Sequence, residues 1–175
     1  MRTYTQISSG SLRPGELTDL IENLSQLDIH VTPSPVYNAE SLWQTYSAEL
    51  KFYKSIAKSA FHILYNHEAI DSIIAMQVVY ALYKRRPVVM IGRPVFSERL
   101  DPELRAILEK YIRQFHAANL LRMEFAELSF ILNKLKPEAD YKLTHEEKIT
   151  IITKIREHLY DLVGRGIGET NAPLR

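Results

Sequence analysis

The chain has 175 residues, 46% of them hydrophobic and 25% charged, as in a folded globular protein rather than a disordered one. Lysine and arginine (22) nearly balance aspartate and glutamate (21), and the resulting net charge of +1 argues against a protein that binds the nucleic-acid backbone. The chain has no cysteine, which excludes disulfides, thiolate metal sites and cysteine nucleophiles.

The sequence carries no targeting or membrane signal. Its first ten residues lack the continuous apolar segment of a signal peptide, and no apolar run approaches the ~20 residues that cross a bilayer. The absence of cysteine agrees with a reducing compartment. We therefore expect a cytoplasmic protein with no membrane partner.

Short β-favouring segments alternate with segments of helical periodicity along most of the chain. In chain order, we expect a strand from Tyr4 to Ile7, a helix over 16–27, a strand within 28–37 that ends at Pro33, a helix over 38–60, a strand over 61–66, a helix over 71–84, a strand over 87–92, a helix over 101–115, a strand over 118–125, and helices over 126–135 and 144–163. The tail, residues 164–175, lacks this periodicity and is expected to be loose.

Three helix starts carry capping signals. Asp71 is expected to cap the helix over 71–84. Asp101 precedes Pro102, a residue favoured at the first helical position. Thr144 and Glu147 have the spacing of a capping box.

This alternation predicts parallel strands joined by right-handed helical crossovers. We expect a Rossmann-like α/β fold: an open, mainly parallel five-stranded sheet flanked by helices, with an extra C-terminal helix. Residues 1–136 would form the α/β domain, and residues 137–175 a helix and tail packed on it. Ligands of such sheets bind where the strands end, which selects loop 8–15, residues 66–71 and the start of the helix that carries Gln77.

Motifs at these places resemble those of one enzyme family. Residues 10–15 read GSLRPG, residues 60–64 read AFHIL, and Gln77 begins the segment QVVYA, which precedes Arg86-Pro87 and a strand. The chain thereby resembles the nucleoside 2-deoxyribosyltransferase superfamily, which includes the 2'-deoxynucleoside 5'-phosphate N-hydrolases. There the loop often reads Gly-Ser-Ile-Arg-Gly-Gly, the strand begins Ala-Asp, and the helix carries Glu where this chain has Gln77. The likeness covers about residues 3–135 and leaves out the helix over 144–163.

The resemblance implies a Rossmann-like fold, no cofactor, and cleavage of the N-glycosidic bond of deoxynucleosides or their monophosphates. In the family, the glutamate that matches Gln77 is the nucleophile that forms a covalent glycosyl-enzyme. A neutral amide is a poor nucleophile, so Gln77 marks the catalytic position and is expected to be inactive there. Two departures suggest a narrowed pocket: Ile7 replaces a tyrosine of the N-hydrolases, and residues 72–75 lack the family's glycines.

The loop after the first strand supplies candidate ligand-binding residues. Its hydroxyls, backbone N–H groups and one arginine could hold a phosphate or a ribose, with an amide at the end of the third strand binding base or sugar. These substrate-binding candidates are Ser9, Gly10, Ser11, Arg13, Gly15 and Asn66. The alternative for the loop is a plain strand-to-helix turn, and the alternative for Gln77 is a residue facing solvent or satisfied by a neighbouring group.

Metal binding is not expected. The six histidines, at positions 30, 62, 67, 116, 145 and 158, do not have the spacing of metal ligands. We predict neither a metal nor another cofactor.

Three functions remain open. The first is a nucleoside- or nucleotide-binding protein whose glycosidic-bond chemistry is lost or reduced. The second is an active deoxyribosyltransferase or deoxynucleotide N-glycosidase that uses another carboxylate: Asp71, a weak candidate favoured as a cap, or Glu68, or one from a neighbouring subunit. The third is a non-catalytic oligomerisation or interaction module whose pocket is filled by Ile73 and Ile74.

Tyrosines are numerous, ten in all. Tyr46, Tyr53, Tyr80 and Tyr83 lie on two predicted helices, where they fit either a subunit interface or ordinary packing. Because members of the family generally assemble into oligomers, we expect a homo-oligomer, a dimer or larger.

Overall fold

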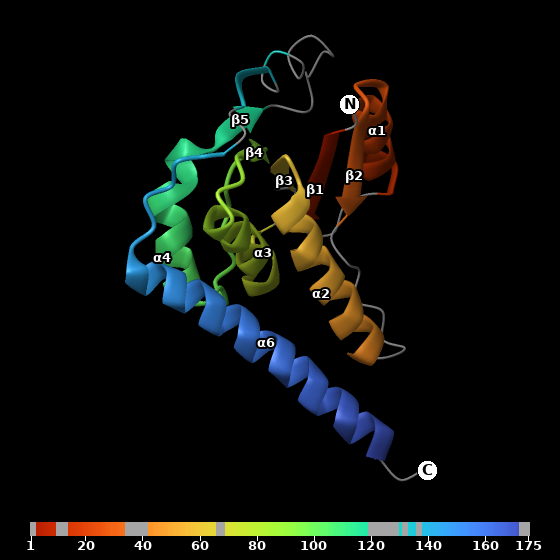
Figure 1. Cartoon of the computed structure of the whole chain (residues 1–175), viewed down its shortest axis with the longest axis vertical. Helices are drawn as coiled ribbons and strands as arrows, with labels where there is room; N and C mark the ends of the chain where they lie inside the picture. Colours follow the sequence, from red (N-terminus) through yellow and green to blue (C-terminus); the bar gives the residue numbers. More distant parts are fainter. Residues whose placement is uncertain are drawn as a thin grey trace.

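Five parallel strands form one sheet at the centre of the computed structural model (Figure 1). They are β1 (Thr3–Ser9), β2 (Ile29–Pro33), β3 (Phe61–Tyr65), β4 (Val88–Ile91) and β5 (His116–Ala118), in the order β2-β1-β3-β4-β5. Each neighbouring pair is parallel. The structure describes residues 3–9, 14–33, 42–65, 69–118, 130, 133–135 and 138–171.

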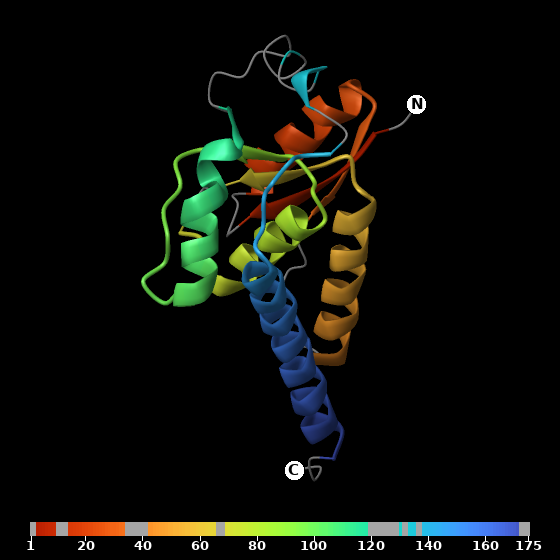
Figure 2. The same cartoon turned by 60° about the vertical axis from the view of Figure 1, so that its left-hand side comes forward.

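Helices lie on both faces of this sheet, as predicted (Figure 2). The helices are α1 (Pro14–Gln26), α2 (Leu42–Lys58), α3 (Ser72–Tyr83), α4 (Pro102–Tyr111), the short 3-10 helix η1 (Ile112–Gln114) and α6 (His145–Asn171). Helix α1 covers one face, α2, α3 and α4 cover the other, and α6 runs across the outside of these three. The Rossmann-like fold class expected from the sequence is therefore confirmed.

Side-chain alternation along β3 separates two apolar cores. Phe61 and Ile63 pack with residues of α1 such as Leu24, whereas Leu64 points into the larger core beneath α2 and α3. Successive residues of a strand face opposite sides of the sheet. A strand covered on both sides therefore reads as one continuous apolar run, and His62 is the exception in this one.

The capping predictions are confirmed. The Asp71 carboxylate accepts the N–H of Ile74 at 2.8 Å and begins α3. Asp101 accepts the N–H groups of two residues in the first turn of α4, Glu103 and Leu104. Thr144 and Glu147 bond to each other's backbone N–H in a capping box, at 2.9 and 3.1 Å.

Several element boundaries differ from the prediction, among them the end of β1, which runs to Ser9 and so includes two residues of the predicted loop 8–15. Strand β5 begins at His116, two residues early, and residues 119–125 of the predicted strand lie outside the described residues, as does most of the helix predicted over 126–135. The expectation of a loose tail was wrong as far as Asn171, because α6 continues to that residue. Glycine lowers helix propensity by only about 1 kcal/mol, and a helix already nucleated gains one hydrogen bond per added residue.

Helix α6 is docked by apolar and polar contacts. Ile151 and Ile155 are buried in the larger core, and Leu162 is also buried. The Lys154 ammonium lies 2.7 Å from the Asp101 carboxylate, and His158 Nε2 lies 2.7 Å from the buried carboxylate of Glu49 on α2. Within the described residues, no helix is both long enough and apolar enough to cross a membrane.

Of the four tyrosines singled out from the sequence, Tyr53 belongs to the core and not to the surface. Its ring is buried and meets the edge of Tyr80 with the centroids 5.3 Å apart. Burial, together with the nearby Glu49 carboxylate, raises the pKa of Tyr53 and keeps the phenol neutral. Tyr80 stacks in turn on Tyr83. Packing within the chain therefore accounts for these three rings.

We expect Ile151→Ala to lower the free energy of unfolding by about 3 kcal/mol, because it removes a fully buried side chain beneath α6 and leaves a cavity. Ile149→Ala is the matched control: the same residue type stands two positions earlier in the same helix with 53% of its surface exposed. That control should change stability by less than about 0.5 kcal/mol. Urea denaturation measures both, and equal losses would contradict the docking described here.

Candidate functional site

Gln77 lies beneath the carboxyl end of β1, although it belongs to α3. Its side chain is 1% exposed. Its Oε1 atom accepts a hydrogen bond of 2.7 Å from the hydroxyl of Ser8, the last residue but one of β1. Gln77, the residue predicted to occupy the nucleophile position, is therefore held inside the fold by a polar contact to the first strand.

Ser8 also contacts His62 on the neighbouring strand β3, with 2.8 Å between Oγ and Nε2. A hydroxyl has one proton, which Ser8 donates to Gln77. His62 Nε2 must then carry the proton that Ser8 accepts. The hydrogen bonds consequently run in one direction, from His62 through Ser8 to Gln77, and we call these three residues the polar trio.

His62, like Ser8, is fully buried. Burial lowers the pKa of its imidazole from 6.5 to about 3, so the ring is neutral at physiological pH. Its Nδ1 atom is buried without a hydrogen-bond partner. The ring also meets the edge of Phe52 on α2, 6.4 Å between centroids. A neutral ring in these surroundings is a structural donor to Ser8 rather than an acid.

The sheet register explains why these residues meet. Ser8 pairs with Leu64 and Gln6 pairs with His62, so Ser8 and His62 lie on the same face of adjacent strands. That face is the one covered by α2 and α3. In the order β2-β1-β3, the chain leaves β1 and β3 towards opposite faces of the sheet. The polar trio therefore lies beside the switch point where ligands of open α/β sheets commonly bind.

The structure describes only some of the predicted site residues. Ser9 ends β1 opposite Tyr65, the last residue of β3. Gly15 is exposed in the first turn of α1, and a Cβ atom added there would meet nothing within 4 Å. Asp71 is exposed and caps α3. Outside the described residues lie Gly10, Ser11, Arg13, Asn66 and the alternative acid Glu68.

Three residues that were expected to narrow the pocket lie in the apolar cores. Ile7 is fully buried in the core beside α1, on the face of β1 opposite to Ser8. Ile74 is buried in the larger core, and Ile73 packs against it. Ser8, by contrast, was considered only as the start of loop 8–15 and His62 only among the histidines that lack metal spacing, and neither was predicted as a site residue. Both residues are polar side chains at buried positions of strands. Because buried polar groups need hydrogen-bond partners, this pattern could have indicated that Ser8 and His62 interact.

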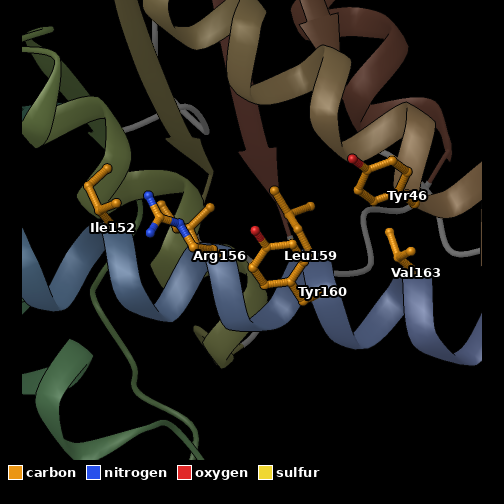
Figure 3. Close-up of a pocket in the computed structure, with 7 residues that line it drawn as sticks. Tyr46, Ile152, Arg156, Leu159, Tyr160 and Val163 are labelled. Carbon is orange, nitrogen blue, oxygen red and sulfur yellow. The ribbon is translucent and has the colours of Figure 1, made fainter.

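A concave region lies on the other side of the helical layer from the polar trio. It is a groove of about 420 Å³ between α2 and α6 (Figure 3). Its lining residues are Tyr46, Ile152, Ile155, Arg156, Leu159, Tyr160 and Val163. Among the residues that the structure describes, no group of three histidine, aspartate or glutamate side chains could hold a metal ion.

Comparison with known proteins identifies the fold. No protein-family model matches the sequence, and no curated protein matches it. The structure is similar to that of the 2-deoxyribosyltransferase from the psychrotolerant bacterium Bacillus psychrosaccharolyticus, with a TM-score of 0.52 and 12% identity over 77% of this chain and 98% of that one. The fold is deoxyribosyltransferase-like. A CMP N-glycosidase from Clostridium botulinum is also similar, with a TM-score of 0.45 and 9% identity over 75% of this chain and 97% of that one.

Proposed function

We propose that this protein with a deoxyribosyltransferase-like fold binds a nucleoside or nucleotide where β1 and β3 end, and that its N-glycosidic-bond chemistry is lost or reduced. One observation carries the proposal. Gln77, which the sequence resemblance aligns with the family nucleophile, is an amide that is buried and bonded to Ser8 at the end of β1.

An amide at this position explains the loss of chemistry. A carboxylate can attack an anomeric carbon, because it bears a negative charge that stabilises the oxocarbenium-like transition state. The Gln77 oxygen is neutral and already accepts the Ser8 proton. A group of this kind neither bonds to carbon at a useful rate nor stabilises developing positive charge.

Ligand contacts would come from the two segments that follow β1 and β3. We assign sugar or phosphate binding to Ser9, Gly10, Ser11, Arg13 and Gly15, with Asn66 on the base or sugar. Gly15 stands in the first turn of α1, and a helix N-terminus attracts anions through its unpaired N–H groups. A nucleoside monophosphate would therefore bind more tightly than the nucleoside itself.

Titration calorimetry against deoxynucleosides and their monophosphates tests this proposal directly. At least one member of the panel is expected to bind, and Arg13→Ala should weaken the monophosphate more than the nucleoside. Arg99→Ala, a change to an arginine exposed elsewhere in the chain, is the control and should leave both affinities unchanged. If no compound in the panel produces heat of binding, the proposal fails.

The rival proposal is an active enzyme that uses another carboxylate. Asp71 is the described candidate, but its carboxylate is engaged as the cap of α3. Asp71→Asn keeps a capping side chain and removes the charge. Release of free base by the wild-type protein, abolished in this variant, would support the rival and contradict loss of chemistry.

An interaction module is a second candidate function, favoured by the exposed apolar groove between α2 and α6. It does not exclude ligand binding, because the groove lies between α2 and α6, whereas the polar trio lies between the sheet and α3.

A further inference from the structure

Basic side chains collect where two neighbouring helices end. Helices α2 and α3 pack on the same face of the sheet, and each ends just before the next strand, β3 or β4, begins. Their ends therefore lie at one edge of the parallel sheet, where a hydrogen bond of 2.8 Å joins Arg86 Nη2 to the carbonyl of Ala57. We call the six basic residues of this region the basic cluster: Lys51, Lys54 and Lys58 of α2, with Lys84, Arg85 and Arg86 at the end of α3.

Most of the basic cluster is not neutralised by acidic side chains. The three lysines of α2 stand three and four residues apart, which places them along one exposed side of that helix. The acidic residue of α2, Glu49, is buried and paired with His158. Within the described part of the chain, Arg85 alone of the six forms an ion pair, an exposed one with Glu138. The net charge of +1 thus conceals a concentration of positive charge at this edge.

Helix dipoles do not account for the whole basic cluster. A cation at the C-terminal end of a helix is stabilised by the dipole, which fits Lys58 in the last turn of α2 and Lys84 at the cap of α3. Lys51 and Lys54 lie before the last turn, where this effect is weak.

The backbone of Arg85 is a second sign of function. Its φ is 59°, in the left-handed region that glycine adopts without steric cost. Hydrogen bonds from Arg85 N–H to Leu82 and from Arg86 N–H to Ala81 form a Schellman motif, whose left-handed position is usually glycine. The arginine gains only an exposed ion pair there, which stabilises little. We therefore attribute this residue to a role that needs its charge.

Two tyrosines stand beside these charges. Tyr80 and Tyr83 pack within the chain, with their stacked rings 6.1 Å apart between centroids, yet both stay partly exposed. The Lys84 ammonium lies 5.8 Å from the ring centroid of Tyr80 and 5.6 Å from that of Tyr83. Proteins that bind single-stranded nucleic acid combine such groups, because bases stack on aromatic rings while cations meet the phosphates.

We propose that the basic cluster binds single-stranded nucleic acid, with phosphates on the cations and a base against the exposed part of Tyr83. An anionic membrane fits less well, because the described residues of α2 and α3 expose no large apolar side chain that could enter a bilayer. The proposal goes beyond nucleotide binding where β1 and β3 end and does not depend on it, since the basic cluster lies at the opposite edge of the sheet.

Fluorescence anisotropy of a labelled oligo(dT) of about 20 nucleotides, titrated with the full chain, tests this proposal. Binding is expected at about 20 mM salt. If about five cations are engaged, raising the salt to about 200 mM should weaken binding by about a thousandfold or more, because each phosphate contact releases about 0.7 of a counterion. No binding at about 20 mM salt and about 100 μM protein would overturn the proposal.

Charge reversals locate the binding surface. Lys54→Glu and Lys84→Glu should each weaken binding by about tenfold or more at low salt and reduce its salt dependence. Arg99→Glu is the matched control, since it makes the same change of charge at an exposed arginine after β4, at the opposite edge of the sheet. It should keep the affinity within about twofold of the wild type. Equal losses in all three variants would show that only net charge matters and would overturn the proposal.

Arg85→Gly separates binding from stability. Glycine suits the left-handed position, so the urea midpoint of unfolding should not fall and is expected to rise. The affinity for oligo(dT) should nevertheless fall by about fivefold or more, because one phosphate contact is lost. Unchanged affinity in this variant would contradict the role given to Arg85.

Competitors and one aromatic change identify the partner. Tyr83→Leu keeps an apolar side chain and should weaken oligo(dT) by about fivefold, while binding of a duplex of the same length stays unchanged. Polyglutamate or phosphatidylserine vesicles that compete as well as the oligonucleotide would overturn the proposal. An excess of a nucleoside monophosphate should not displace oligo(dT). Displacement would place the oligonucleotide at the ends of β1 and β3 and would also overturn the proposal.

Discussion

Replacing Gln77 with glutamate is expected to lower the free energy of unfolding by about 3–5 kcal/mol at pH 8, and by far less at pH 4. The site is buried, and Ser8 can donate only one hydrogen bond to the new carboxylate. Burial raises the pKa of such a carboxyl above its value of about 4.3 in the unfolded chain. Urea denaturation of variant and wild type at several pH values measures the difference.

The direction of this pH dependence follows from proton binding. Below about pH 4 the carboxyl is protonated in both states and resembles the amide that it replaces. As pH rises above that value, the unfolded chain loses its proton first, so the folded variant loses about 1.4 kcal/mol of stability per pH unit. The loss ends where the buried carboxyl itself ionises.

The same variant tests the reason proposed for the missing chemistry. With a carboxylate at the position proposed for the nucleophile, the variant is expected to release base from ligands that we propose the wild type binds without cleavage. An increase of about tenfold over the wild-type background corresponds to only ~1.4 kcal/mol of barrier. Chromatographic detection of free base is a sufficient assay.

Gln77→Met is the matched control for both measurements. It has similar length and no charge, so its stability relative to the wild type should not depend on pH, and it should release no base. Equal behaviour of the glutamate and methionine variants would contradict both the burial of residue 77 and its assignment to the nucleophile position.

His62 is expected to destabilise the protein as the solution becomes acidic. Its pKa is lowered by burial from 6.5 to about 3, so its contribution to stability is complete above pH 6.5 and lost as pH falls towards 3. The window of 3.5 pH units corresponds to about 5 kcal/mol in all, and pH 5 lies far enough into it to remove about 2 kcal/mol. Denaturation at pH 7.5 and pH 5 measures this loss.

A comparison with His62→Leu isolates the imidazole from other titrating groups. Leucine is apolar and leaves the bond from Ser8 to Gln77 in place, so the variant should lose about 2 kcal/mol less than the wild type between the two pH values. His145→Leu, a change at the exposed first residue of α6, should lose as much as the wild type. Identical losses in all three proteins would mean that His62 is not the buried neutral group described here.

The sequence predicted the fold because its signals are local. The apolar runs over 61–66 and 87–92 indicated strands, the second of them covered on both faces. Asp71, Asp101 and Thr144 marked helix starts by chemistry that needs only the next three residues. The end of α6 was missed for the opposite reason. The helix extends to Asn171 because tertiary contacts anchor its earlier turns. The glycine-containing sequence after Val163 does not reveal those contacts.

The location of Gln77 was predictable from the sequence, whereas its role stays a prediction. Alignment of short motifs placed Gln77 near the end of β1, and its contact with Ser8 agrees with that placement. The contacts of Ser8 with His62 and Gln77 join residues 54 and 69 positions apart. Which polar residues of two strands share a face depends on sheet register, and no local pattern specifies it.

Helix α6 has a consequence for how copies or partners can approach. Helix α6 lies over α2, α3 and α4, so the outer surface of these three helices belongs to the interior of the chain. In a protein without such a helix, a bound subunit would have to cover the same surface. A chain truncated before His145 would uncover the apolar side chains that now meet Ile151 and Ile155 and would tend to aggregate. Helix α6 thus covers the apolar face of α2, α3 and α4 within the same chain, and no second subunit is needed to cover it.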